Sequence, residues 1–338
     1  MRHKSIDETI NKPTPMIPVL KFTTYFKPVI WGGERIARFK RIPSQGNDIG
    51  ESWELSPMPG HESVVADGPY EGMTLNSLVA KHPEEILGRK VNARWHGKFL
   101  LLVKIIDSND DLSIQVHPDD KYAAEHYGKD SLGKTEMWYS IDPQPGAYLY
   151  AGFNRPMDAA TFKQMIDDNS IVDALAKFDV VKGDFFYLPA GRVHAIGKGN
   201  LVVEIQEASD TTYRIYDYDR RDSNGNPREL HVDRAKEVVS YDDIPGEKEN
   251  IIPPTGEEAS LADCEYFTAA VRDIDKSVTL ETGRLDSFTI LISIDGDMAV
   301  TTPDGQTTPL PQGHTLLIPA CQPSISITGS GKILTAHL

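Results

Sequence analysis

The chain has 338 residues, of which 39% are hydrophobic and 25% charged, the ordinary composition of a soluble globular protein. This length exceeds what one compact core usually holds, so we expect two domains. The formal net charge of −15 argues against nucleic acid or an anionic membrane surface as partner, because both bind basic surfaces. The only two cysteines, Cys264 and Cys321, form neither a CxxC motif nor a disulfide framework, which favours a reducing compartment, the cytoplasm.

The N-terminal stretch MRHKSIDETINKPTPMIPVLKF is charged and lacks the apolar region of a signal peptide. No run of apolar residues approaches the ~20 that span a bilayer. We expect residues 1–19 to be poorly ordered and a first domain to begin at residue 20.

The predicted elements are mostly strands, interrupted by a few helices. Helical periodicity is found at residues 73–87, 156–178 and 231–241. Strand patterns are found at residues 99–106, 146–153, 184–191, 201–207 and 212–219. The sequence therefore predicts a mainly β fold with helical decoration.

A segment rich in proline, glycine and charge, DDIPGEKENIIPPTGEEAS, follows Tyr241. Such composition is typical of a linker. We therefore expect a first domain at residues 20–245, a linker at 246–260 and a C-terminal β domain at 261–338.

The stretch LSIQVHPDD alternates apolar and polar residues. In an extended chain Leu112, Ile114 and Val116 would lie on one face, and Ser113, Gln115 and His117 on the other. A solvated strand face usually carries Thr, Lys or Glu, so this polar row favours a polar cavity.

A short sequence repeat occurs once in each of the two predicted domains. GDFFYLPAGRVHAI begins at Gly183 and GHTLLIPACQPSIS begins at Gly313, and both have the form Gly, five residues, Pro with apolar residues between. Five positions after the proline the first copy has His194 and the second has Ser324. The same strand and turn is expected twice, once with a metal-binding side chain and once without it.

Polar groups at strand spacing occur in four segments. They are Ser113, Gln115 and His117; Lys134 and Glu136; His194; and Glu204 with Gln206. A barrel lines its interior in this way without disturbing its outer packing. Two imidazoles, one carboxylate and one amide oxygen suit Zn²⁺ as a four-ligand set, and a centre of about +1 charge would favour a ligand that develops negative charge. Singly, His117 or His194 would more often be a hydrogen-bonded core residue, so the prediction depends on the joint pattern.

Two basic residues stand where an apolar environment would make them costly. Lys104 interrupts FLLLVKII and either extends its amine to water or faces the polar cavity. Arg214, in TTYRIYDYD, suits a phosphate or an enediolate oxygen. The alternative for Arg214 is a structural pair with Asp210 or Asp217.

Six motifs together resemble the class I mannose-6-phosphate isomerases in their shorter bacterial form: KPVIWGGERI, GESWELS, LSIQVHPDD, GKTEMWY, LPAGRVHAIGKG and EIQEASDTTYRIYDYDR. The resemblance extends from about residue 20 to the C-terminus. It implies cupin-type, jelly-roll β-barrels, one with a metal and one without, in agreement with Ser324 in the repeat.

The resemblance also implies roles for single residues. The family's zinc ligands fall on Gln115, His117, Glu136 and His194, with one Zn²⁺ per chain. Its active-site arginine falls on Arg214. The other polar residues around its substrate fall on Lys104, Ser113, Lys134 and Glu204. Arg220 stands where longer members have lysine, which keeps the charge but changes the geometry of a phosphate contact.

The implied activity is the interconversion of mannose 6-phosphate and fructose 6-phosphate through a cis-enediol. Arg214 would stabilise the enediolate or the phosphate, Glu204 or Lys134 would move protons, and Lys104, Ser113 and Arg220 would bind substrate. We expect a monomer or weak homodimer. The alternatives are a phosphosugar-binding cupin without activity and an iron cupin oxygenase, the latter disfavoured by the amide at Gln115.

Overall fold

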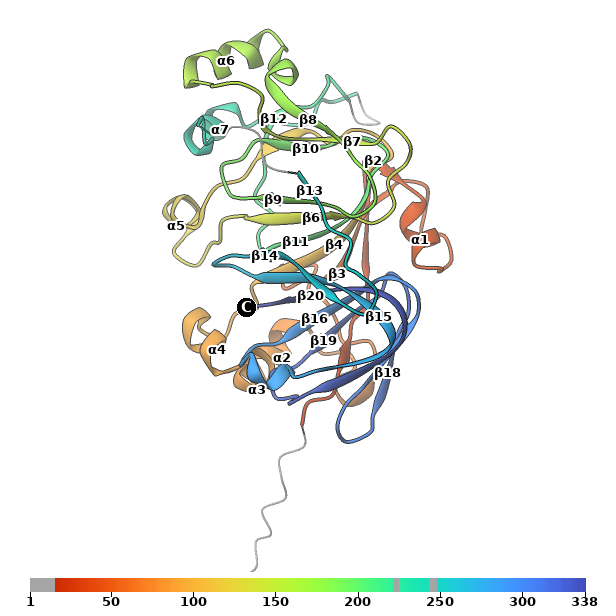
Figure 1. Ribbon diagram of the computed structural model, residues 1–338. Helices are drawn as coiled ribbons and strands as arrows, with labels where there is room; N and C mark the ends of the chain where they lie inside the picture. The colour runs from red at the N-terminus through yellow and green to blue at the C-terminus, as the bar shows by residue number, and fades with distance from the viewer. Residues whose placement is uncertain (1–15, 222–224, 243–247) are drawn as a thin grey trace, which may run out of the picture.

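The computed structural model describes residues 16–221, 225–242 and 248–338 (Figure 1). Most of the segment predicted to be poorly ordered, residues 1–15 of 1–19, lies outside the described residues. Within its last four residues, Ile17 and Val19 are buried.

The described residues form three antiparallel sheets. One has the order β13-β9-β6-β11-β4-β3-β2 and a second the order β12-β5-β10-β7-β8. The third, from the C-terminal part of the chain, has the order β1-β19-β16-β20-β15-β14, with β17 and β18 attached through β20. The strand bounds are β1 Leu20–Lys21, β2 Tyr25–Gly33, β3 Ile49–Leu55, β4 Leu101–Asp107, β5 Ile114–Val116, β6 Glu136–Ser140, β7 Tyr148–Phe153, β8 Leu175–Asp179, β9 Asp184–Leu188, β10 His194–Ile196, β11 Leu201–Glu207, β12 Tyr213–Tyr216, β13 Lys248–Asn250, β14 Glu258–Asp263, β15 Thr268–Leu280, β16 Thr289–Asp295, β17 Met298–Thr301, β18 Thr307–Leu310, β19 Thr315–Ile318 and β20 Ile325–His337.

Short helices cover the outside of these sheets. They are α1 Arg35–Phe39, α2 Leu75–Lys81, α3 Pro83–Leu87, α4 Arg89–Trp95, α5 Asp120–Tyr127, α6 Ala159–Asp167 and α7 Val232–Val238. Figure 1 shows α6 and α7 at the end of the molecule away from the C-terminal domain. Three begin at side-chain caps: Asp158 accepts from Thr161 N at 2.7 Å, Asp119 from Tyr122 N at 2.7 Å, and Thr74 from Ser77 N at 3.2 Å. No helix among the described residues is long and apolar enough to cross a bilayer.

Successive side chains of the central strands β4 and β11 point to opposite faces and pack into two different cores. In β4, Val103 and Ile105 join the apolar core shared with the C-terminal domain, whereas Ile106 joins the core between the two facing sheets. In β11, Val203 and Val202 divide in the same way. Because successive side chains point to opposite faces, one strand can pack against the neighbouring domain and line the barrel interior. One face of these strands therefore joins the domains, and the other, which carries both Ile106 and Lys104, is directed into the barrel.

The repeat found in the sequence is a repeat of structure. Gly183 and Gly313 both have positive φ, of 88° and 77°, and each precedes a strand, β9 or β19. The carbonyls of Pro189 and Pro319 each accept a hydrogen bond from the backbone three residues later, at 3.1 and 3.0 Å. His194 then begins β10, whereas Ser324 directly precedes β20. The prediction that the second barrel is metal-free stays a prediction.

The structure differs from the sequence prediction in places. The range 156–178, predicted as helix, ends in β8, because the apolar residues from Leu175 onward pair with β7. Helices α1, α4 and α5 had no clear sequence signal. Leu112 packs inside the barrel, away from the face of Ile114 and Val116, because β5 begins only at Ile114.

The chain crosses the predicted domain boundaries at two points. Strand β1, from the N-terminal segment, pairs with β19 of the C-terminal sheet. Strand β13, inside the predicted linker, pairs with β9. The boundaries at 245 and 261 stay a prediction.

Candidate active site and metal centre

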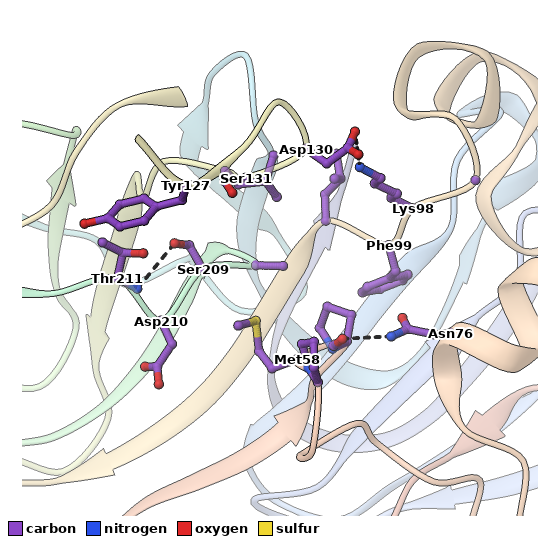
Figure 2. Close-up of a pocket in the computed structure, with 16 residues that line it drawn as sticks. Met58, Asn76, Lys98, Phe99, Tyr127, Asp130, Ser131, Ser209, Asp210 and Thr211 are labelled. Carbon is purple, nitrogen blue, oxygen red and sulfur yellow. Dashed lines mark hydrogen bonds and ion pairs between the residues drawn. The ribbon is translucent and has the colours of Figure 1, made fainter. Parts of the chain in front are cut away.

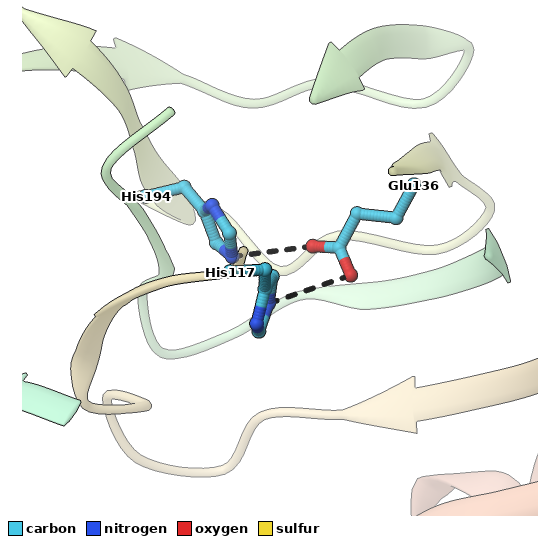
Figure 3. Close-up of side chains that lie close together, drawn as sticks. All are labelled: His117, Glu136 and His194. Carbon is cyan, nitrogen blue, oxygen red and sulfur yellow. Dashed lines mark ion pairs between the residues drawn. The ribbon is translucent and has the colours of Figure 1, made fainter. Parts of the chain in front are cut away.

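Three metal-binding side chains converge inside the first barrel (Figure 3). His117 follows β5, Glu136 begins β6 and His194 begins β10. Their ligand atoms lie within 4.8 Å of one another, and all three residues are buried. Glu136 Oε1 is 3.2 Å from His194 Nε2, and Oε2 is 3.7 Å from His117 Nε2. We call this group the His-Glu-His cluster.

Backbone carbonyls set the orientation of both imidazoles. His117 Nδ1 donates to Thr211 O at 2.8 Å, and His194 Nδ1 donates to Arg192 O at 2.9 Å. Since each Nδ1 carries the proton, each Nε2 presents its lone pair to Glu136. This is the arrangement that metal-binding histidines need.

Gln115 stands beside the cluster as a fourth candidate ligand. It lies on β5 directly opposite His194 on β10, and its Nε2 is 3.3 Å from His194 Nε2. A half-turn of the amide places the side-chain oxygen there, the atom that binds metals.

The electrostatics of the cluster fit a divalent cation. Glu136 is fully buried, and neither oxygen accepts a well-aligned hydrogen bond from the described residues, although Lys134 Nζ lies 2.9 Å from Oε2. A buried carboxylate so placed is costly without a cation. Burial, opposed by Lys134, raises the pKa of Glu136 to about 7. Burial and the Lys134 charge lower the pKa of His117, and lower that of His194 to about 3, so both imidazoles are neutral near pH 7, the form that binds metal.

A cavity of about 360 Å³ reaches the cluster through Gln115 and Lys134. Its basic lining residues are Lys27, Lys104, Lys134, Arg214 and Arg228. Its acidic lining residues are Glu51, Glu204 and Asp210. In a chain of net charge −15, this local excess of positive charge favours an anionic ligand.

A larger cleft of about 530 Å³ lies beside this cavity, and Asp210 lines both (Figure 2). Its walls include Met58, Phe99 and Tyr127. Neither Gln115 nor Lys134 lines this cleft, and its Thr211 contacts His117 through a backbone carbonyl, so we assign the chemistry to the smaller cavity.

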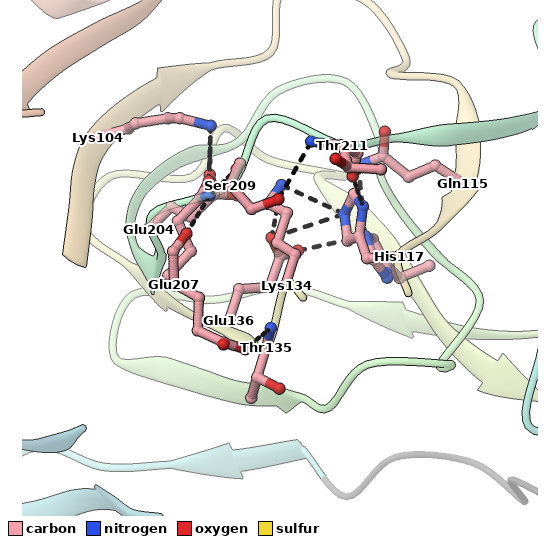
Figure 4. Close-up of polar contacts among 12 residues, drawn as sticks. Lys104, Gln115, His117, Lys134, Thr135, Glu136, Glu204, Glu207, Ser209 and Thr211 are labelled. Carbon is pink, nitrogen blue, oxygen red and sulfur yellow. Dashed lines mark hydrogen bonds and ion pairs between the residues drawn. The ribbon is translucent and has the colours of Figure 1, made fainter. Parts of the chain in front are cut away.

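Lys104 and Glu204 form a buried pair on the inner face of the seven-stranded sheet (Figure 4). Lys104 Nζ is 2.9 Å from Glu204 Oε1, and Trp138 Nε1 donates to Glu204 Oε2 at 2.9 Å. Burial raises the pKa of Glu204, but Lys104 and Lys134 outweigh it and lower the pKa to about 2. Glu204 and Glu51 in turn outweigh burial and raise the pKa of Lys104. The pair is therefore charged throughout the physiological pH range.

Arg214 and Ser113 line the cavity beside Gln115. Arg214 on β12 lies opposite Gln115 on β5. Its Nε donates to Ser113 Oγ at 3.2 Å, and its Nη1 to Glu229 O at 2.9 Å. Ser113 precedes Gln115 by two residues and lies directly before β5. Burial and the nearby Arg228 charge lower the pKa of Arg214.

The structure brings together nine of the ten residues predicted for the site. They are Lys104, Ser113, Gln115, His117, Lys134, Glu136, His194, Glu204 and Arg214. Arg220 is elsewhere: it does not line the cavity, and its guanidinium binds Asp217 Oδ1 at 2.6 Å and the Asp111 carbonyl.

Sequence reasoning missed four charged residues that line the cavity, namely Lys27, Glu51, Asp210 and Arg228. For Glu51 a signal was present, because a carboxylate inside the apolar stretch IGESWEL needs a buried partner. Glu51 lies 3.3 Å from Lys27 Nζ and 3.7 Å from Lys104 Nζ. Arg228 and Asp210 lie outside the strands and had no comparable signal.

Glu207 fixes the backbone between Lys134 and Glu136. Its Oε2 accepts from Thr135 N at 2.6 Å, and its own N donates to Thr135 O at 3.1 Å. Burial and then the Asp120 charge raise the pKa of Glu207 to about 8. A carboxyl group with a raised folded-state pKa stabilises the fold fully below its ordinary pKa of 4.5, and this stability is lost as the pH rises to about 8.

We expect Glu207→Gln, which keeps an acceptor for Thr135 N but cannot ionise, to unfold at a higher temperature than the parent at pH 9. The difference should be a few degrees and should shrink below pH 5. Thermal unfolding from pH 5 to 9 measures it, with the exposed Glu125→Gln as control. A Tm difference that does not depend on pH would contradict the raised pKa.

The fold and site together define a cupin whose first barrel holds a buried cluster that could bind a metal ion. Residues 19–146 match the family model described as phosphomannose isomerase type I, catalytic domain, and residues 257–338 match mannose-6-phosphate isomerase, cupin domain. The chain belongs to the type I phosphomannose isomerase family.

Similar proteins extend over nearly the whole chain. Mannose-6-phosphate isomerase ManA of Bacillus subtilis is 37% identical over 94% of this chain and 98% of its own length. Mannose-6-phosphate isomerase of Streptococcus mutans is 36% identical over 91% and 94%. The crystal structure of the mannose 6-phosphate isomerase from Bacillus subtilis has a TM-score of 0.84 and 34% identity, covering 95% of this chain and 99% of that one. The predicted cupin fold and family are confirmed.

Proposed function

We propose that this chain is a Zn²⁺-dependent isomerase that interconverts mannose 6-phosphate and fructose 6-phosphate. The observation that carries the proposal is that one cavity reaches the His-Glu-His cluster and is lined by Lys104, Lys134, Glu204 and Arg214. Close relatives named as mannose-6-phosphate isomerases over nearly their whole length support the substrate. We also propose that the protein is located in the cytoplasm and that its oligomeric state is a monomer or a weak homodimer.

His117, Glu136, His194 and Gln115 would hold the zinc ion. Their nitrogen and oxygen ligand atoms, and two neutral imidazoles, suit Zn²⁺. Bound there, the ion would supply a Lewis acid for the carbonyl and hydroxyl oxygens of the open-chain sugar.

The reaction moves protons and consumes no oxidant. The C2–H bond breaks, its electron pair forms the C1–C2 double bond, and the aldehyde oxygen takes up a proton to give a cis-enediol. The oxygen on C2 then loses a proton while C1 gains one, which yields the ketose. The protein must therefore provide one group that removes and returns a proton, and donors for the oxygens.

Of the two candidate bases, we propose Lys134. Glu204 already accepts hydrogen bonds at both oxygens, and its pKa of about 2 makes it a weak base. Lys134 Nζ lies between the cavity and the cluster, 3.2 Å from His117 Nε2. When deprotonated, the Lys134 amine would accept the C2 proton and return it at C1, while Glu204 holds Lys104 towards the substrate oxygens.

Incubation with mannose 6-phosphate in deuterated water tests the activity and its route. We expect fructose 6-phosphate that carries deuterium at C1 in a fraction of turnovers, because a proton held on a side chain exchanges with water. Mass spectrometry and proton NMR measure both. The reverse reaction should place deuterium at C2 of mannose 6-phosphate.

The outcomes separate the alternatives. Binding without any product would mean a phosphosugar-binding protein without activity. Product that never carries deuterium would favour a direct hydride shift over the enediol. Lys134→Met should abolish the exchange, whereas the surface control Lys121→Met should not.

A further inference from the structure

The inference below rests on the proposed function and concerns the phosphate of the substrate. Near neutral pH this group carries about two negative charges and strong acceptor oxygens, so it is held best by more than one guanidinium. Arg214 supplies one. The second guanidinium has to come from an arginine other than Arg220, because Arg220 does not line the cavity.

Arg220 is committed to other partners. Its Nη2 binds Asp217 Oδ1 at 2.6 Å, its Nη1 binds the Asp111 carbonyl, and its guanidinium carbon lies 5.2 Å from the centre of the Tyr218 ring. These contacts hold the loop that follows β12.

Arg228 reaches the cavity from the same loop. It lines the cavity together with Arg214, Ser113 and Thr212. Its side chain is 24% exposed, so it is partly screened from water but open to a ligand. Its Nε donates to Asp217 Oδ2 at 2.8 Å, and its Nη2 binds Asp217 Oδ1. A guanidinium has five N–H donors, more than this pair uses.

Asp217 is the buried anchor for both arginines. Its side chain is 5% exposed and it accepts from Arg220 and Arg228 at once. The next two residues, Tyr218 and Asp219, have φ of 56° and 53°, the left-handed region that side chains other than glycine rarely adopt. Such a backbone persists only where the surroundings hold it. The Asp217 carboxylate therefore fixes the position of Arg228. Because one carboxylate pairs with two guanidinium groups, the three side chains together keep a net positive charge.

We propose that Arg228, oriented by Asp217, is the second phosphate contact of this enzyme, and that Arg220 acts only on the shape of the loop. Arg228, Arg214 and Ser113 would then form a seat for the phosphate, with Ser113 two residues before Gln115 in the chain. The reacting end of the sugar would lie towards Gln115 and Lys134.

Steady-state kinetics and phosphate binding test this assignment. For Arg228→Ala we expect the KM for mannose 6-phosphate to rise roughly 10- to 100-fold, the usual scale for a charge-assisted hydrogen bond, with kcat changed far less. The affinity for inorganic phosphate, measured by calorimetry on the metal-loaded protein, should fall by a similar factor. Arg228→Lys should give an intermediate KM, because it keeps the charge but not the fork.

Two matched variants separate a direct contact from an effect on the loop. Arg220→Ala also frees one partner of Asp217 but removes no lining residue, so its KM should stay within about threefold of the parent. Arg221→Ala changes the net charge equally at an exposed position of the same loop. An unchanged KM and phosphate affinity in Arg228→Ala, or an equal rise in Arg220→Ala, would overturn the proposal.

The test also distinguishes this inference from the proposed function. If the parent protein fails to isomerise mannose 6-phosphate, the activity is wrong. Phosphate binding lost selectively in Arg228→Ala would still support the seat in that case. If the parent isomerises mannose 6-phosphate and Arg228→Ala binds phosphate as the parent does, the proposed phosphate contact is wrong and the proposed function stands.

Discussion

Replacing His194 by alanine is expected to reduce the metal content of the purified protein from about one ion per chain to almost none, and the isomerase activity with it. Zinc sites built from four side chains bind with about 10–16 kcal/mol, so one ligand is worth roughly 3 kcal/mol, or 10²-fold or more in affinity. His194 Nε2 faces Glu136 Oε1 at 3.2 Å, so its loss removes one of the atoms that would surround the ion.

Elemental analysis by mass spectrometry after dialysis measures the metal, and it also identifies it. His126→Ala, on the exposed surface of α5, is the matched control and should keep the full metal content. Circular dichroism shows whether each variant is folded. Full metal retention in a folded His194→Ala protein would rule out the ligand assignment. A metal other than zinc would contradict only the identity of the ion, and the ligand assignment would stand.

Replacing Arg214 by alanine is expected to lower kcat/KM by about 10² to 10³ while the metal stays in place, the usual scale for losing one donor to a developing oxyanion. Arg214 lines the cavity and donates to Ser113, but it does not contact the His-Glu-His cluster. Its removal should therefore affect the substrate and leave the metal ligands unchanged.

The division of the Arg214 effect between kcat and KM tells which end of the substrate it contacts. A fall in kcat would indicate stabilisation of the enediolate, and a rise in KM with a similar kcat would indicate the phosphate. Arg155→Ala, an exposed arginine elsewhere on the barrel, controls for loss of charge. Near-normal kinetics in Arg214→Ala would mean that its bonds to Ser113 and Glu229 O are purely structural.

Much of the fold followed from local pattern. Strand β11 was predicted at residues 201–207 and lies at Leu201–Glu207, because a strand with apolar side chains on both faces gives a strong signal. The Gly-x5-Pro repeat identified two equivalent strand-turn units, because a left-handed glycine and a proline turn impose the same backbone wherever they occur. The helix at 156–178 was predicted too long, because pairing with β7 overrode the local preference of residues from Leu175 onward.

The sequence by itself determined which side chains point into the barrel. Alternation along a strand is a local property, so Ser113, Gln115 and Glu204 could be assigned to inner faces without the partner strands, whereas Lys104 kept two alternatives. The family resemblance then supplied candidate roles for these positions.

Only the tertiary structure decided which of these side chains meet, and which arginine reaches the cavity. Gln115 faces both His194 and Arg214 because β5 pairs with β10 and β12, strands about 80 and 100 residues later in the chain. Arg220 and Arg228 lie in one irregular loop, where no periodicity relates sequence to direction. Their directions depend on a single buried carboxylate, Asp217, whose position is set by long-range packing that no local pattern contains.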